Sequence, residues 1–295
     1  MGEVGNSEPS VSPTGVSWVG KAFLFAAPLL MLVAAWGGAI EIKGAMAEPR
    51  DISPPVSDAE PDGPMLFARH CARCHGERGD GNGLTSIEPK ARYFGYDPYK
   101  LASTTNGIPT DDDLVRLLRR GIPGTSMESF EPILSEPQMH AIIGHLRELT
   151  RRGIYARLQK KAIKDDDYEP LEVATKALAQ SQIGPVLDVP TSFAPPSAAS
   201  IAQGKIVYTK ACANCHGPDG NLEAAEVKVL LHDNGTPIRP RNFLTGVFKG
   251  GSEPNQLYLR IMLGVPGTPM SANKSLSRTE VEDLINYVRS MAGSK

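Results

Sequence analysis

The same two-part motif occurs twice in the sequence, and this repeat constrains the fold more than any other feature. The first part is C-x-x-C-H, and the second, some fifty residues later, is G-[IV]-P-G-T-x-M. The first parts consist of Cys71, Cys74 and His75, and of Cys212, Cys215 and His216. The second parts span residues 121–127 and 264–270 and end at Met127 and Met270. The repeat predicts two domains of nearly equal length, which a chain of 295 residues can accommodate.

C-x-x-C-H is the motif at which c-type haem is attached covalently. Its two thiols add to the haem vinyl groups, and the adjacent histidine reaches the iron from one face. A lone C-x-x-C also occurs in redox dithiols and in zinc sites. A zinc site would hold its cysteine pairs about 15–20 residues apart, whereas these pairs stand in different halves of the chain. Neither alternative explains a histidine after both pairs, so we expect two covalently bound haem c groups.

Each repeat ends on a methionine that can supply the second axial ligand of the same iron. Most methionines are core residues, and we assign four without a repeat counterpart to that class: Met65, Met139, Met262 and Met291. Met127 and Met270 differ, because glycine and proline fix the backbone before each sulfur. A thioether ligand favours ferrous iron and raises the reduction potential. We therefore expect His75 and Met127 on one iron, and His216 and Met270 on the other.

The four histidines outside the motifs have no repeat counterpart and are interpreted as surface or core residues: His70, His140, His145 and His232. His140 and His145 are the alternative ligands if the methionine assignment is wrong.

In each copy a third repeated block lies between the C-x-x-C-H motif and the methionine segment, and it carries one arginine and one lysine. Arg92 and Lys100 in the first copy match Arg241 and Lys249 in the second, at equal spacing and with aromatic neighbours. Such residues can belong to solvated loops with packed rings. We favour the alternative that they bind the haem propionates through charge-assisted hydrogen bonds, since bulky rings beside a cation would also line a haem crevice.

Helical patterns dominate both copies. Helices over 65–73 and 201–213 are predicted to lead into the two C-x-x-C-H motifs. Amphipathic helices over 137–149 and 278–291 close the copies, with apolar residues at helical spacing. Ser277 with Glu280, and Ser135 with Gln138, are predicted to form capping boxes at their starts. No alternating strand pattern is apparent, so we predict an all-α fold.

The expected domains are residues 61–152 (the first domain) and 199–295 (the second domain). Residues 153–198 form the predicted connector between them. A further helix is predicted near 169–181, and a Pro-, Ser- and Ala-rich stretch over 185–200 favours an extended segment along a domain surface.

The N-terminal segment is predicted to span a membrane. A polar leader over 1–21 precedes an uncharged run over 22–40, and a linker over 41–60 follows. As a helix the uncharged run would be about 28 Å long, close to the thickness of a bilayer core. Ala45-Met46-Ala47 has the small-x-small pattern of a signal-peptidase site, but the run exceeds the usual length of a cleavable signal. We favour a retained anchor over cleavage after Ala47.

With these residues in place, the chain resembles a dihaem cytochrome c built from two tandem class I domains. The resemblance covers about 60–152 and 198–293, and residues 109–127 are particularly similar to periplasmic cytochrome c domains of respiratory complexes. It implies short helices around each haem, with the motif histidines as proximal ligands, Met127 and Met270 as distal ligands and the cysteines as thioether anchors. The second domain departs from this pattern at residues 251–255, which leaves the conformation of that loop open.

The resemblance implies an electron-transfer protein rather than an enzyme, with its haem domains exported to the outer face of a bacterial cytoplasmic membrane. A quinol-oxidising or dehydrogenase complex would supply electrons, and a terminal oxidase or reductase would receive them. Whether the chain is a free carrier or a subunit is left open, as is a soluble periplasmic form if the segment is cleaved. The net charge of −2 gives no indication of nucleic-acid binding.

Two alternatives require an iron that small molecules can reach. One is a dihaem peroxidase and the other is a haem-based gas sensor. Equivalent methionines in both copies argue against an open iron, and no output domain for a sensor is visible in the sequence.

Overall fold

The computed structural model describes residues 61–83, 87, 90–95, 97–226 and 229–292. The predicted leader (1–21), anchor (22–40) and linker (41–60) lie outside the described residues. Within the described ranges, no helix combines the length and the apolar character needed to cross a membrane.

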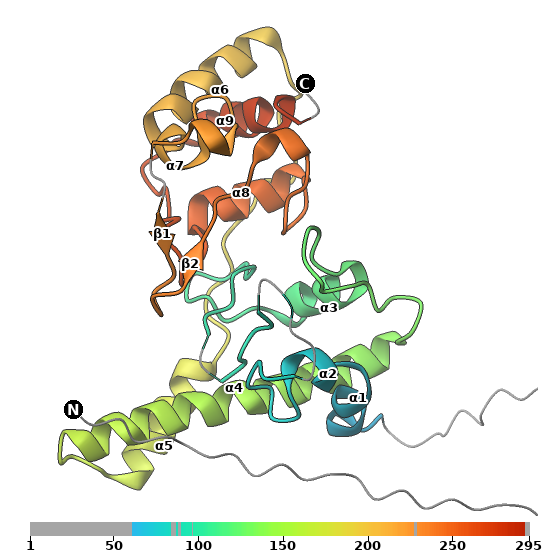
Figure 1. Cartoon of the computed structure of the whole chain (residues 1–295), viewed down its shortest axis with the longest axis vertical. Coiled ribbons are helices and arrows are strands. Elements are labelled where there is room, and N and C mark those ends of the chain that lie inside the picture. The colour runs from blue at the N-terminus through green and yellow to red at the C-terminus, as the bar shows by residue number, and fades with distance from the viewer. Residues whose placement is uncertain (1–60, 84–86, 88–89, 96, 227–228, 293–295) are drawn as a thin grey trace, which may run out of the picture. The chain divides into compact units, whose positions relative to one another are not determined.

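The first domain is built from four helices, of which α1 and α4 begin close to the predicted positions (Figure 1). They are α1 (Gly63–His70), α2 (Ala72–His75), α3 (Asp111–Arg120) and α4 (Glu136–Lys164). The predicted capping box of Ser135 and Gln138 is confirmed at the start of α4. Helix α3 was not predicted, although Thr110 and Asp113 form a further capping box at its start.

The second domain repeats this order. Its helices are α6 (Ala198–Ala211), α7 (Ala213–His216), α8 (Pro254–Leu263) and α9 (Arg278–Ser290), with short 3₁₀ turns η1 (Leu222–Ala224) and η2 (Phe243–Thr245). The capping box of Ser277 and Glu280 is confirmed. The loop at 251–255 leads into α8 as the corresponding loop leads into α3, but Glu253 at the N-cap forms no side-chain cap.

One small sheet corrects the expectation that the chain lacks strands. The antiparallel strands β1 (Leu230–Leu231) and β2 (Pro237–Ile238) pair in the second domain. Two-residue strands carry too little alternation to be detected in a sequence. The described structure is otherwise mainly helical, with two cytochrome c-like domains.

The connector is more ordered and more helical than predicted. Helix α4 does not end near residue 149 but continues to Lys164, and α5 (Pro170–Ser181) confirms the predicted helix near 169–181. The following extended segment pairs with the first domain, where the Thr105 amide donates to the Pro185 carbonyl at 2.9 Å. It then reaches the second domain, where Asn286 donates to the Ala194 carbonyl at 3.3 Å.

In each domain the first helix crosses the last helix at close range. A Cβ on Gly63 of α1 would lie 2.1 Å from the Ala141 carbonyl oxygen of α4, and one on Gly204 of α6 would lie 2.0 Å from the Asp283 carbonyl oxygen of α9. Only glycine permits these approaches. The crossings fix the helix that carries each C-x-x-C-H motif against the domain core.

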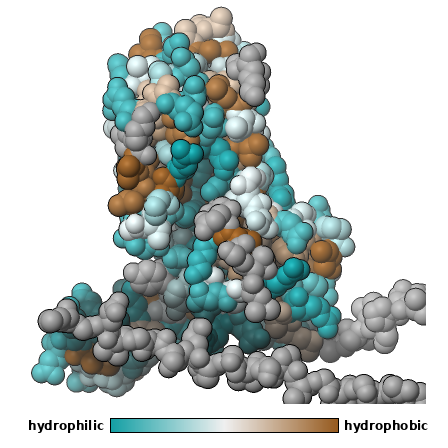
Figure 2. All heavy atoms as spheres, in the orientation of Figure 1, coloured by the Kyte–Doolittle hydropathy of each residue, from teal (hydrophilic) through white to brown (hydrophobic). Residues whose placement is uncertain are grey.

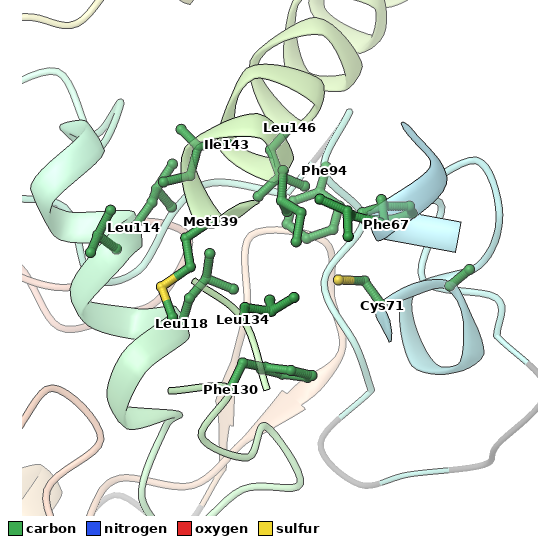
Figure 3. Close-up of a cluster of buried hydrophobic side chains, with 14 of the residues drawn as sticks. Phe67, Cys71, Phe94, Leu114, Leu118, Phe130, Leu134, Met139, Ile143 and Leu146 are labelled. Carbon is green, nitrogen blue, oxygen red and sulfur yellow. The ribbon is translucent and has the colours of Figure 1, made fainter. Parts of the chain in front are cut away.

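The core of the first domain gathers apolar side chains from α1, α3 and α4 (Figure 3). Met139 is buried there, as predicted for a core methionine. Figure 3 shows the Cys71 side chain directed toward the interior, where Leu134 and Phe130 also lie. On the face seen in Figure 2, exposed hydrophobic residues lie in small separate groups within a mainly hydrophilic surface.

Candidate functional site

The two C-x-x-C-H motifs have the same local structure. Cys71 ends α1 and precedes the single turn of α2, which ends at His75. Cys212 and His216 stand at the same places around α7. The glycine after each histidine has a positive φ, at 77° for Gly76 and 82° for Gly217. The chain therefore turns sharply after each histidine, and the ring of each stays partly buried in its domain.

Each motif histidine donates a hydrogen bond to the backbone of the repeated arginine. The Nδ1 atom of His75 lies 3.2 Å from the Arg92 carbonyl oxygen, and that of His216 lies 3.0 Å from the Arg241 carbonyl oxygen. A carbonyl only accepts, so Nδ1 carries the proton and the lone pair is on Nε2. This is the tautomer that a metal-binding histidine needs.

The same two rings are held by aromatic contacts and kept neutral by burial. His75 lies 4.7 Å from the ring centre of Phe94, and His216 stacks on Phe243 at 4.5 Å. Burial lowers the pKa of both histidines, against the smaller raising effect of the hydrogen bond to the arginine carbonyl. A neutral, oriented imidazole is ready to bind iron.

The loops that carry the methionines are closed by matching hydrogen bonds. In the first loop the Ile122 amide donates to the Met127 carbonyl at 2.8 Å, and the Met127 amide donates to the Thr125 hydroxyl at 3.1 Å. The second loop repeats these bonds between Val265 and Met270 at 2.9 Å, and between Met270 and Thr268 at 3.2 Å. The threonine of the motif thus fixes the backbone of the methionine that follows it.

One continuous cavity of about 1920 Å³ brings the predicted site residues of both domains together. Its lining includes all twelve: Cys71, Cys74, His75, Arg92, Lys100, Met127, Cys212, Cys215, His216, Arg241, Lys249 and Met270. All four thiols are free of disulfides. A cavity with paired thiols, a neutral imidazole, a thioether and cations along its wall fits haem c.

Two of the four remaining histidines line the cavity, but they are not the two that were expected as alternative ligands. The two proposed fallback ligands, His140 and His145, do not line the cavity, whereas His70 and His232 do. His140 is exposed beside Glu136, and His145 packs on Phe67. His232 donates from Nδ1 to the Gly267 carbonyl at 3.0 Å and so holds the second methionine loop.

The two repeated arginines are engaged differently. The Arg92 guanidinium donates to the Asp97 and Pro98 carbonyls of its own loop and lies 3.5 Å from the ring centre of Tyr99. Its Nε is buried without a partner among the described residues. Burial lowers the pKa of Arg92 to about 10, so it stays charged at neutral pH. Two nitrogens of the guanidinium therefore hold the loop, and one buried N–H has no partner among the described residues.

Arg241 and the two lysines leave more charge free for an anion. Within the described ranges, Arg241, Lys100 and Lys249 form no side-chain hydrogen bond or ion pair. Burial is the main cause that lowers the pKa of each, and for Lys249 the nearby cations Arg241 and Lys100 lower it further. Partial burial of these cations is costly, although Asp97 offsets part of that cost at Lys100. The carboxylates of haem propionates would relieve it further.

Two further repeated positions were missed in the sequence. Gly63 and Gly204 stand eight residues before the first cysteine of each motif, and Phe67 and Tyr208 stand four before it. The Tyr208 hydroxyl donates to the Gly217 carbonyl at 2.7 Å, next to His216. An extension of the repeat alignment toward the N-terminus of each motif would have revealed both positions.

Comparison with known families divides the chain into the same two parts. A family described as "Cytochrome c" matches residues 201–292, and one described as "Cytochrome C oxidase, cbb3-type, subunit III" matches residues 58–146.

Individual relatives give a consistent picture. The chain is 25% identical to the cbb3-type cytochrome c oxidase subunit CcoP of Azospirillum sp. (strain B510), covering 79% of this chain and 62% of that protein. It is 26% identical to the cytochrome c subunit of alcohol dehydrogenase (quinone) from Gluconacetobacter polyoxogenes, and the match covers 84% of this chain and 52% of that protein. The chain thus spans only about half to three fifths of these curated relatives.

One solved structure resembles this chain, and the match includes nearly all of the solved chain. It is a chain of the Kuenenia stuttgartiensis reducing HAO-like protein complex, with 32% identity and a TM-score of 0.63. The similarity covers 78% of this chain and 95% of that one.

Proposed function

We propose that this chain is a cytochrome c with two haems that carries electrons within a respiratory complex, and the matches of its two halves to cytochrome c families support the proposal. The observation that carries the proposal is the pair of hydrogen bonds from His75 and His216 to the carbonyls of Arg92 and Arg241. These bonds leave Nε2 of each histidine as the metal-binding atom on the wall of a cavity that also contains a methionine from the same domain.

When bound, haem c would supply a one-electron redox couple. The residues of the chain would attach and orient this group. The cysteines would hold the group through thioether bonds, and the hydrogen bond from Nδ1 keeps each histidine correctly oriented for the iron. Met127 and Met270, on their closed loops, would each supply a thioether ligand to the iron of their own domain and keep small molecules from reaching it.

The cations of the cavity would set the reduction potential. Arg92, Lys100, Arg241 and Lys249 line the cavity and would compensate the charge of the propionates. A cation near the iron favours the reduced state, because reduction lowers the positive charge of the site by one.

The relatives support a subunit rather than a free carrier. Two are named as cytochrome subunits of an oxidase and of a quinone-dependent alcohol dehydrogenase, and the solved chain belongs to a multiprotein complex. We infer a dehydrogenase or quinol-oxidising complex as donor and a terminal oxidase or reductase as acceptor. A membrane anchor over 22–40 with exported haem domains completes the proposal, supported by the uncharged run.

The decisive test is to express the whole chain with the c-type maturation machinery, count its covalent haems by mass spectrometry and titrate them potentiometrically. Two haems per chain and two one-electron steps are expected. Replacement of Cys212 and Cys215 by Ala should remove one haem and leave the other step, whereas the exposed His140→Ala control should retain both. A single haem in the wild-type protein would overturn the dihaem proposal, and separation of membrane and soluble fractions tests the anchor.

A further inference from the structure

The two domains are joined by direct hydrogen bonds that no motif of the sequence indicates. A connector of some forty-five residues would allow two haem domains to move independently. Both domains nevertheless fall within one compact unit of the chain. The contacts between them lie at the loops that carry the candidate propionate-binding cations.

An arginine from each domain reaches the lysine-bearing loop of the other. Arg260 of α8 donates to the carbonyls of Lys100 and Ala102 in the first domain. Arg116 of α3 donates to the carbonyl of Gly250, directly after Lys249 in the second domain, at 3.0 Å. The contact is therefore reciprocal, since each domain supplies a helix arginine and receives one on its lysine loop.

These two arginines are partly buried rather than held in bulk solvent. Burial lowers the pKa of Arg260 to about 10, with a counteracting effect of Asp113, and it also lowers that of Arg116. Arg116 is fixed further by Asp113, whose carboxylate lies 3.7 Å away and also accepts from Ser103 at 2.8 Å. Hydrogen bonds from a partly buried charged donor are stronger than exposed ones.

Methionine loops and cation loops also meet across the same boundary. A Cβ on Gly124, in the first methionine loop, would lie 3.1 Å from the Arg241 guanidinium of the second domain. A Cβ on Gly267, in the second methionine loop, would lie 2.4 Å from Pro98 in the first domain's cation loop. The single cavity runs across this boundary and contains all four candidate propionate-binding cations.

We propose that Arg116 and Arg260 are positioning residues that clamp the two domains together, so that the four cations form one shared cluster and the two haem sites act as a single coupled redox unit. This inference rests on the proposed function, because it concerns the same two sites. In a shared cluster, an electron gained at one site lowers the potential of the other through their common electrostatic environment.

The test compares the wild-type chain with Arg116→Gln, Arg260→Gln and the double variant. Wild type should titrate as two interacting centres, and its two oxidised irons should broaden each other's EPR signals. Each single variant should weaken both effects, and the double variant should abolish the redox interaction and increase the radius of gyration measured by small-angle scattering. Arg260→Lys, which keeps a charged donor, should restore part of the interaction.

Arg119→Gln is the matched control, because Arg119 lies on the same helix as Arg116 but pairs with Glu136 in its own domain. It should match wild type in all three measurements. A double variant with wild-type redox interaction and wild-type radius of gyration would overturn the clamp. The haem count is taken first, so fewer than two haems would count against the proposed function, while the scattering comparison tests the clamp without reference to haem.

Discussion

The Nδ1 atom of His216 lies 3.0 Å from the carbonyl oxygen of Arg241, and the first domain repeats this bond between His75 and Arg92 at 3.2 Å. The residue predicted to bind iron and the residue predicted to bind a propionate are thus parts of one hydrogen-bonded unit in each domain. The backbone of the arginine orients the histidine, and its side chain extends to the cavity wall. A change in that loop should therefore affect both sides of the site.

Replacement of Arg241 by Ala should lower the midpoint potential of one haem without loss of haem. The guanidinium has no anionic partner within the described structure, and its removal withdraws a cation that favours the reduced state. Potentiometric titration measures the shift. The exposed Arg278→Ala, whose partner is Glu282 on α9, is the control and should titrate as wild type. An unchanged potential in the Arg241 variant would argue against its role toward the propionate.

Met127→Ala and Met270→Ala should each open one iron to carbon monoxide and lower the potential of that haem, because the thioether ligand favours ferrous iron. Carbon monoxide difference spectra and potentiometry follow the two effects. Met65→Ala is the control, since Met65 is 57% exposed on α1 and has no repeat counterpart. If both variants keep the wild-type potentials and exclude carbon monoxide, neither methionine is a ligand.

Gly204→Ala should destabilise the second domain by about 1–3 kcal/mol or more, the usual cost of overpacking. Its Cβ would meet the Asp283 carbonyl oxygen at 2.0 Å, so α6 and α9 would have to separate. Denaturant unfolding followed by circular dichroism measures the loss. Gly144→Ala in α4 meets nothing within 4 Å and should instead stabilise by about 0.5–1 kcal/mol through helix propensity. Equal effects at both positions would contradict the close crossing.

Tyr208→Phe should cost about 0.5–1.5 kcal/mol, the net value of one intramolecular hydrogen bond. The variant keeps the ring packing, because the first domain already has Phe67 at the corresponding position, and loses only the bond to the Gly217 carbonyl. Denaturant unfolding measures the difference. Tyr258→Phe is the control, since its hydroxyl makes no hydrogen bond within the described structure, and its stability should stay near wild type. A neutral Tyr208 variant would show that the bond adds nothing.

Much of the helical architecture was predictable because its signals are local. The capping boxes at Ser135 and Ser277 mark the starts of α4 and α9, and apolar spacing defines their buried faces. Helix α3 was missed, since three aspartates at its start resemble a polar loop, although negative charge favours a helix N-terminus. The end of α4 was misplaced, and in the structure this helix continues to Lys164 and packs on α5.

The candidate site was predictable residue by residue, but its arrangement was not. Repeat alignment selected twelve of the side chains that line the cavity, because each type has a distinct chemical task. It could not indicate that Arg92 uses much of its guanidinium to hold its own loop while Arg241 does not. Nor could it reveal the contacts of Arg116 and Arg260, since these depend on how two separately folded segments meet.

If a histidine and a methionine close both irons, the dithionite-reduced wild-type chain should not bind carbon monoxide, which a difference spectrum measures. With two haems counted in the sample, neither is expected to form a carbon monoxide complex, because Met127 and Met270 would hold the ligand position opposite each histidine. A stoichiometric carbon monoxide complex at one or both haems would contradict this ligand assignment and would favour a peroxidase or a gas sensor.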